Sequence, residues 1–76
     1  SLIHARELFH MAIRRHAASI VIAHNHPSGD PDPSDEDIVV TTRLMGAGNV
    51  MGIKVRDHLI VTSDRCNSLK TMGLME

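Results

Sequence analysis

Aromatic residues and cysteines are almost absent from this chain, and each absence narrows what the chain can do. Phe9 is the only aromatic residue among 76, and there is no tryptophan or tyrosine. A surface without aromatic rings lacks the platforms on which single-stranded nucleic acids stack their bases. Cys66 is the only cysteine, which excludes an intrachain disulfide and favours a reducing cytoplasm as the compartment.

Long apolar runs and charge of one sign are also missing. No apolar run approaches the roughly 18 residues of a membrane span, so we expect no membrane association. The formal net charge is -1, and of the eight Lys and Arg only Arg14 and Arg15 are adjacent. Direct nucleic-acid binding by this segment is therefore not expected. Hydrophobic residues make up 42% of the chain, which is typical of a globular protein.

Hydrophobic periodicity predicts a helix followed by a strand in the first third of the chain. Apolar residues recur at helical spacing over residues 3–16. Residues 18–23 form a short β-branched run, typical of a strand that is buried on both faces. A proline-rich stretch then precedes Ser34, which we interpret as the N-cap of a second helix.

The second half predicts another helix and another strand. Gly46, Gly48 and Gly52 are expected to weaken and then end the second helix. Residues 53–62 alternate well enough for a strand, whereas the tail is ambiguous. This order predicts an α/β fold with a sheet flanked by helices. Because so small a sheet leaves an unpaired edge, and the chain lacks an initiator methionine, we expect residues 1–76 to be a single partial domain.

Residues 24–37 read HNHPSGDPDPSDED and carry the most informative chemistry. If the strand continues to His26, His24 and His26 lie on the same side of it, and two such imidazoles are a common start of a zinc site. The prolines restrict the loop that leads to Asp37, in the first turn of the next helix. A His-His-Asp set would leave the fourth tetrahedral position open, as in catalytic zinc sites.

Simpler interpretations of the same residues stay open. A His-x-His pair is not rare by chance in a chain with six histidines. Ser34 and Asp37 also fit a capping-box variant, in which each side chain binds the backbone amide of the other. Capping and metal binding are compatible if Ser34 caps the helix while Asp37 faces a metal.

Together these residues resemble the JAMM signature of JAB/MPN domains, which reads His-x-His-Pro, six residues, then Ser-x-x-Asp. The sequence HNHPSGDPDPS is more closely similar to the RadC branch of that superfamily. The resemblance extends to ARELF near the start, to ASIVIA before the histidines and to VRDHLIV in the later strand. It therefore covers nearly the whole chain.

The resemblance implies a function and roles for individual residues. It implies a cytidine-deaminase-like fold, with His24, His26 and Asp37 as Zn²⁺ ligands. Ser34 would stabilise the tetrahedral intermediate formed when a zinc-activated water attacks a peptide or isopeptide bond of a protein substrate. The alternative is a non-catalytic metal-binding or interaction module of a RadC-like protein linked to DNA repair or mobile elements.

Three features depart from the family pattern, of which Ala5 in place of the usual proline is a minor change at a helix start. The catalytic glutamate of the family belongs to an upstream strand that these residues do not contain. Of the glutamates present, Glu7, Glu36 and Glu76 are all poorly placed to act as the general base. In addition, residues 63–67 replace the usual glycine-rich turn, so the resemblance does not predict a C-terminal hairpin here.

The remaining candidate residues are expected to have structural roles. Asp57 and His58 are neighbours on a predicted strand and must face opposite ways, so hydrogen bonding or packing is favoured over catalysis. His4, His10 and His16 are interpreted as ordinary helix residues, Cys66 as an unreactive thiol and the five methionines as core filler.

Overall fold

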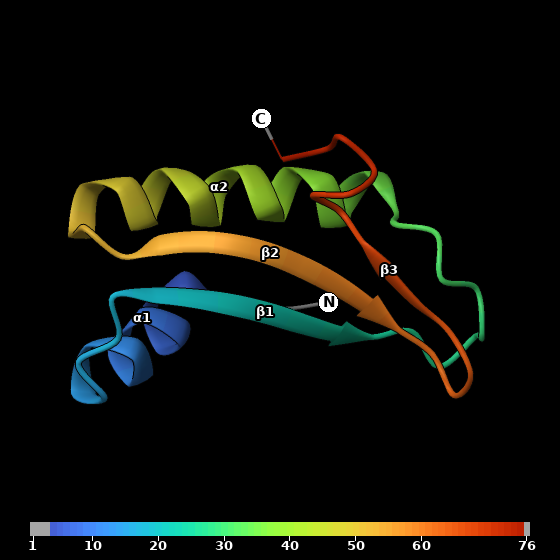
Figure 1. Ribbon diagram of the computed structural model, residues 1–76, viewed down its shortest axis with the longest axis horizontal. Coiled ribbons are helices and arrows are strands. Elements are labelled where there is room, and N and C mark those ends of the chain that lie inside the picture. Colours follow the sequence, from blue (N-terminus) through green and yellow to red (C-terminus); the bar gives the residue numbers. More distant parts are fainter. Residues whose placement is uncertain (1–3, 76) are drawn as a thin grey trace.

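The computed structural model describes residues 4–75 as two helices and a three-stranded sheet (Figure 1). The elements follow in the order α1 (Ala5–Arg14), β1 (Ser19–Asn25), α2 (Asp35–Met51), β2 (Lys54–Val61) and β3 (Cys66–Ser68). This confirms the predicted α/β fold. Neither described helix is long and apolar enough to cross a membrane.

The sheet has the order β1-β2-β3, with β2 in the middle. β1 and β2 are parallel and are joined through α2, whereas β2 and β3 are antiparallel. A tight turn makes the second connection, because the Thr62 amide donates to the Arg65 carbonyl at 2.9 Å. The C-terminal hairpin therefore forms although the glycine-rich turn of the family is replaced.

Only one face of the β1–β2 pair is well buried. The laterally paired residues on this face are Ile20 with Val55, Ile22 with His58, and His24 with Ile60. Phe9 and Ala12 of α1 and Leu44 of α2 pack with Ile22 and Val55 into one core cluster. On the other face Val21 is 55% exposed. The prediction that this strand is buried on both faces is thus wrong, because in the described residues β1 is an edge strand with one covered side.

The helix α1 ends through backbone bonds around His16. The His16 amide donates to Ile13 and the Ala17 amide to Ala12, both at 3.0 Å, while His16 adopts a positive φ of 53°. These are the two bonds of a Schellman motif, in which glycine normally takes the left-handed position. His16 is therefore more than an ordinary helix residue, because it terminates α1. Ile3, at the start of the predicted helix, lies outside the described residues.

The helix α2 continues through Gly46 and Gly48 and ends at Gly52, which has φ 73°. Its inward side consists of Asp37, Thr41, Leu44 and Gly48. A Cβ atom on Gly48 would lie 2.3 Å from the Ile53 carbonyl oxygen, whereas one on Gly46 would meet nothing within 4 Å. Gly48 is thus needed for the close approach of the helix to the start of β2. The prediction that Gly52 ends the helix is confirmed.

The interpretation of the methionines as core filler is only partly right. Met45 and Met75 are half-buried and pack against the core. Three others are exposed: Met11 by 55%, Met51 by 48% and Met72 by 45%. Methionine identity alone does not decide burial, because it also depends on which helix face another element covers.

Candidate metal centre

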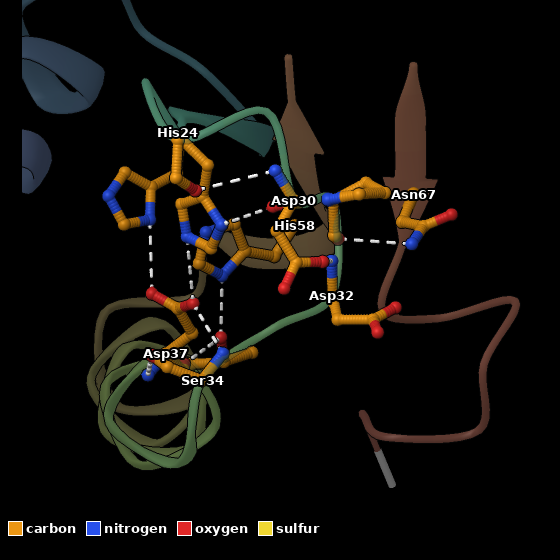
Figure 2. Close-up of polar contacts among 11 residues, drawn as sticks. His24, Asp30, Asp32, Ser34, Asp37, His58 and Asn67 are labelled. Carbon is orange, nitrogen blue, oxygen red and sulfur yellow. Dashed lines mark hydrogen bonds and ion pairs between the residues drawn. The ribbon is translucent and has the colours of Figure 1, made fainter.

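His24 and His26 meet Asp37 where β1 ends and α2 begins. Figure 2 shows His24 above Asp37. The ladder continues past β1, because the His26 amide donates to the Val61 carbonyl at 2.9 Å. His24 and His26 consequently project to the same side, with their ring centroids 4.9 Å apart. The carboxyl end of a parallel strand facing a helix N-terminus is a frequent location for ligand sites in α/β proteins.

Asp37 lies between the two imidazole rings. Its Oδ1 is 3.1 Å from His24 Nδ1, and its Oδ2 is 3.1 Å from His26 Nε2. One donor atom from each of the three residues lies within 4.8 Å of the others. The structure therefore brings together the three residues that the sequence predicts as metal ligands.

The protonation of His26 can be read from its neighbour. His26 Nδ1 lies 3.0 Å from the backbone carbonyl of Asp30, an oxygen that can only accept. Nδ1 therefore carries the hydrogen, and in the neutral ring Nε2 presents a lone pair toward Asp37. Metal-binding histidines are commonly oriented in this way, by donating from the second ring nitrogen to a carbonyl.

His24 Nδ1 is a buried polar atom without a hydrogen-bond partner among residues 4–75. It lies 3.1 Å from Asp37 Oδ1 but makes no hydrogen bond to it. A buried nitrogen left unpaired in this way costs free energy. A cation between the three donors would remove that cost, and two nitrogens with one carboxylate are a donor set that suits zinc.

Asp37 caps α2 at the same time. The Ser34 amide donates to Asp37 Oδ2 at 2.8 Å, and the Asp37 amide donates to Ser34 Oγ at 3.1 Å, which completes the capping box. Burial alone would raise the pKa of Asp37, but the Ser34 backbone and hydroxyl, with His24 and His26, lower it below its ordinary value. The carboxylate is therefore ionised at neutral pH. Capping occupies Oδ2, while Oδ1 makes no hydrogen bond to any described residue.

Ser34 is exposed, and its hydroxyl oxygen is already used as an acceptor in the cap. The same hydroxyl helps to lower the pKa of Asp37, so it also interacts with that carboxylate. The Ser34 hydroxyl is therefore shared between the helix cap and the carboxylate, beside the histidines. The role predicted for Ser34 is compatible with this position.

The proline-rich loop is held by several short-range bonds and one long-range bond. The Asp32 amide donates to Asp30 Oδ1 at 3.0 Å, and Asn67 Nδ2 donates to the Pro31 carbonyl at 3.0 Å (Figure 2). Asn67 belongs to β3, so the hairpin anchors the loop that orients His26. The sequence contains no local signal for this bond, which spans 36 residues.

The neighbours Asp57 and His58 face opposite ways, as predicted. Asp57 accepts from Ser68 Oγ at 2.7 Å and from the His58 and Lys70 amides. Desolvation works against these bonds, yet together they lower the pKa of Asp57. His58 is fully buried beneath the site, and its ring stacks near that of His24, with centroids 6.0 Å apart. The spacing of residues along the sequence does not connect His58 with the metal centre.

Neither Glu7 nor Glu36 belongs to the cluster of metal-binding side chains. Glu7 is exposed on α1, and Glu36 is exposed beside Asp37 but does not join the grouped donor atoms. Glu76 lies outside the described residues. Cys66 is exposed and free.

These features define an α/β domain with a His-His-Asp site that can hold a metal ion. The RadC-like JAB domain family matches residues 1–74, and the chain belongs to that family. Among its relatives is a UPF0758 protein of Desulforamulus reducens, 57% identical over 75 residues, which are 99% of this chain and 33% of the relative. A UPF0758 protein of Moorella thermoacetica is 59% identical over 75 residues, again 99% of this chain and 33% of the relative. The chain thus spans about a third of the length of these relatives.

Proposed function

We propose that this chain forms the zinc-binding part of a metallohydrolase that cleaves a peptide or isopeptide bond. The observation that carries the proposal is the convergence of two imidazoles and one carboxylate within 4.8 Å. The tautomer of His26 supports it, because Nε2 then presents a lone pair toward Asp37. The buried and unpaired His24 Nδ1 beside the same carboxylate also supports it. Membership of the RadC-like JAB family is consistent with it.

Each residue has a defined task in this proposal. His24, His26 and Asp37 would hold Zn²⁺, which when bound supplies a Lewis acid that activates water toward a carbonyl carbon. Ser34 would turn its hydroxyl hydrogen from Asp37 to the oxygen on which charge develops. Its oxygen stays fixed by the Asp37 amide, so this donor needs little reorganisation.

Proton transfer requires one further group. An acid-base carboxylate contributes about 10²- to 10⁴-fold to such reactions. Since neither Glu7 nor Glu36 joins the donor cluster, we propose that this group comes from the part of the longer protein outside residues 1–76. The 76-residue chain should accordingly bind zinc and be nearly inactive.

Zinc titration tests the metal site. We expect calorimetry to give about one zinc per chain. His26→Ala should lose more than about 100-fold in zinc affinity, because removal of a residue that only supports a ligand costs at most about that much. His10→Ala is a matched control, because His10 is an exposed histidine on α1. Unchanged zinc affinity in His26→Ala would refute the site.

An activity assay separates the hydrolase from a non-catalytic module. A longer protein that includes the preceding segment should hydrolyse members of a peptide and isopeptide panel, and chelation should stop the reaction. Ser34→Ala in that protein should lower the turnover rate while zinc stays bound. Tight zinc binding without hydrolysis of any substrate would favour the interaction module. Chelator-sensitive hydrolysis by the 76-residue chain, abolished by Glu7→Gln, would show that the base is Glu7.

A further inference from the structure

A buried side-chain pair joins the central strand to the helix that carries Asp37. His58 on β2 is 0% exposed, and Thr41 on α2 is also 0% exposed. His58 Nδ1 lies 2.6 Å from Thr41 Oγ1, which in turn lies 2.7 Å from the backbone carbonyl of Asp37. Figure 2 shows His58 between the strand and the first turn of α2, near His24.

The direction of both hydrogen bonds follows from the atoms involved. The Asp37 carbonyl can only accept, so the single hydroxyl hydrogen of Thr41 is donated to it. Thr41 Oγ1 must then accept from His58, which places the ring hydrogen on Nδ1. His58 Nε2 is left buried and without a hydrogen-bond partner in the described chain. Burial first, and His24 second, lower the pKa of His58, so the ring is neutral.

This chain of bonds acts on the geometry of the metal centre. His24 lies on β1, whose partner in the ladder is β2, and Asp37 lies in the first turn of α2. The bond from β2 through Thr41 to the Asp37 carbonyl therefore sets how far the carboxylate stands from the imidazoles. A buried, fully directed link of this kind holds that distance better than apolar packing, which has no preferred direction.

We propose that His58 is a positioning residue of the metal centre, acting through the Thr41 hydroxyl on Asp37. The inference rests on the proposed zinc site and extends it to a second layer of residues. Such outer partners typically change metal affinity by about 10- to 100-fold when they are removed. His58 does not touch the metal or a substrate, because it is fully buried beneath the ligands.

The tautomer is tested first, on the full chain without metal. Long-range ¹H–¹⁵N spectra should show the His58 hydrogen on Nδ1, with Nε2 unprotonated. A hydrogen on Nε2 would overturn the inference, because Thr41 would then donate to the ring and release the Asp37 carbonyl. This measurement needs no variant and is independent of zinc.

Zinc affinity of matched variants tests the consequence. His58→Asn places an amide donor where Nδ1 stands, whereas His58→Gln places its amide where Nε2 stands. Thr41→Ser keeps the hydroxyl, and Thr41→Val removes it at nearly constant shape. We expect the zinc affinity of His58→Asn and Thr41→Ser to stay within about threefold of the parent chain. The zinc affinity of His58→Gln and Thr41→Val should fall by about 10- to 100-fold.

Two controls distinguish failure of this inference from loss of folding and from failure of the proposed zinc site. Far-UV circular dichroism establishes which variants are folded. If His58→Gln or Thr41→Val does not fold, His58→Asn and Thr41→Ser provide the readout. A loss of zinc affinity of more than about 10-fold in both His58→Asn and Thr41→Ser would overturn the inference. Folded His58→Gln and Thr41→Val with zinc affinity equal to that of the parent chain would also overturn it. Zinc binding that His26→Ala leaves unchanged would instead refute the proposed metal site itself.

Discussion

Replacement of Gly48 by alanine measures how closely α2 is seated on the sheet. The new Cβ would lie 2.3 Å from the Ile53 carbonyl oxygen and 3.3 Å from Val55 Cγ2. The carbonyl is backbone and cannot rotate away, so either the helix or the start of β2 must shift. Gly48 also accepts the Ile53 amide at 2.9 Å in the helix terminus, which such a shift would strain.

The magnitude follows from two opposing effects. Overpacking costs about 1–3 kcal/mol, and a clash with backbone belongs at the upper end of that range. Alanine recovers about 1 kcal/mol over glycine in a helix interior. We therefore expect Gly48→Ala to lower the free energy of unfolding by about 2 kcal/mol. Gly46→Ala, with nothing within 4 Å of its Cβ, should raise it by about 1 kcal/mol.

Urea unfolding followed by far-UV circular dichroism is the suitable assay, because the chain has no tryptophan or tyrosine for fluorescence. The shift of α2 should also move Asp37, so Gly48→Ala should weaken zinc binding while Gly46→Ala leaves it unchanged. If the two substitutions had equal effects on stability, the close approach at Gly48 would be refuted.

Four further predictions concern the cap, the ligands, the hairpin and the end of α1. Ser34→Ala should cost about 1 kcal/mol of stability and keep zinc, whereas Asp37→Asn should keep an acceptor for the cap and lose zinc; equal zinc retention in calorimetry would leave Asp37 as a cap alone. Acidification should weaken zinc binding, since protonated imidazoles cannot ligate; an affinity independent of pH in calorimetric titrations would exclude histidine ligands. The lowered pKa of Asp57 means that its stabilising contribution is present above the unfolded value near 3.9 and is lost as pH falls through the folded value. Asp57→Asn should therefore reduce stability at neutral pH and flatten the acid limb of a stability–pH curve; an unchanged acid limb would contradict this. His16→Gly should raise stability by about 1 kcal/mol, because glycine adopts the left-handed conformation without strain, and a lower melting temperature would contradict the Schellman assignment.

The sequence by itself predicted both helices, the two long strands and the proposed ligand set, but not β3. Alternating and helical apolar spacing predicted both helices and the two long strands, because these patterns are local. The capping box of Ser34 and Asp37 was readable for the same reason, since its two residues are three apart. The His-x-His spacing and the rigid loop predicted the metal centre from residues 24–37 alone.

Only the tertiary structure decided what surrounds those ligands. The bond from His58 to Thr41 joins residues 17 apart on different elements, and the bond from Asn67 to Pro31 joins residues 36 apart. Periodicity shows that His58 and Asp57 face opposite ways, but it does not show which face another element covers. The requirement for Gly48 likewise exists only because the Ile53 carbonyl approaches it. These features depend on how the elements pack against one another, and packing is set by contacts between side chains that are distant in the sequence.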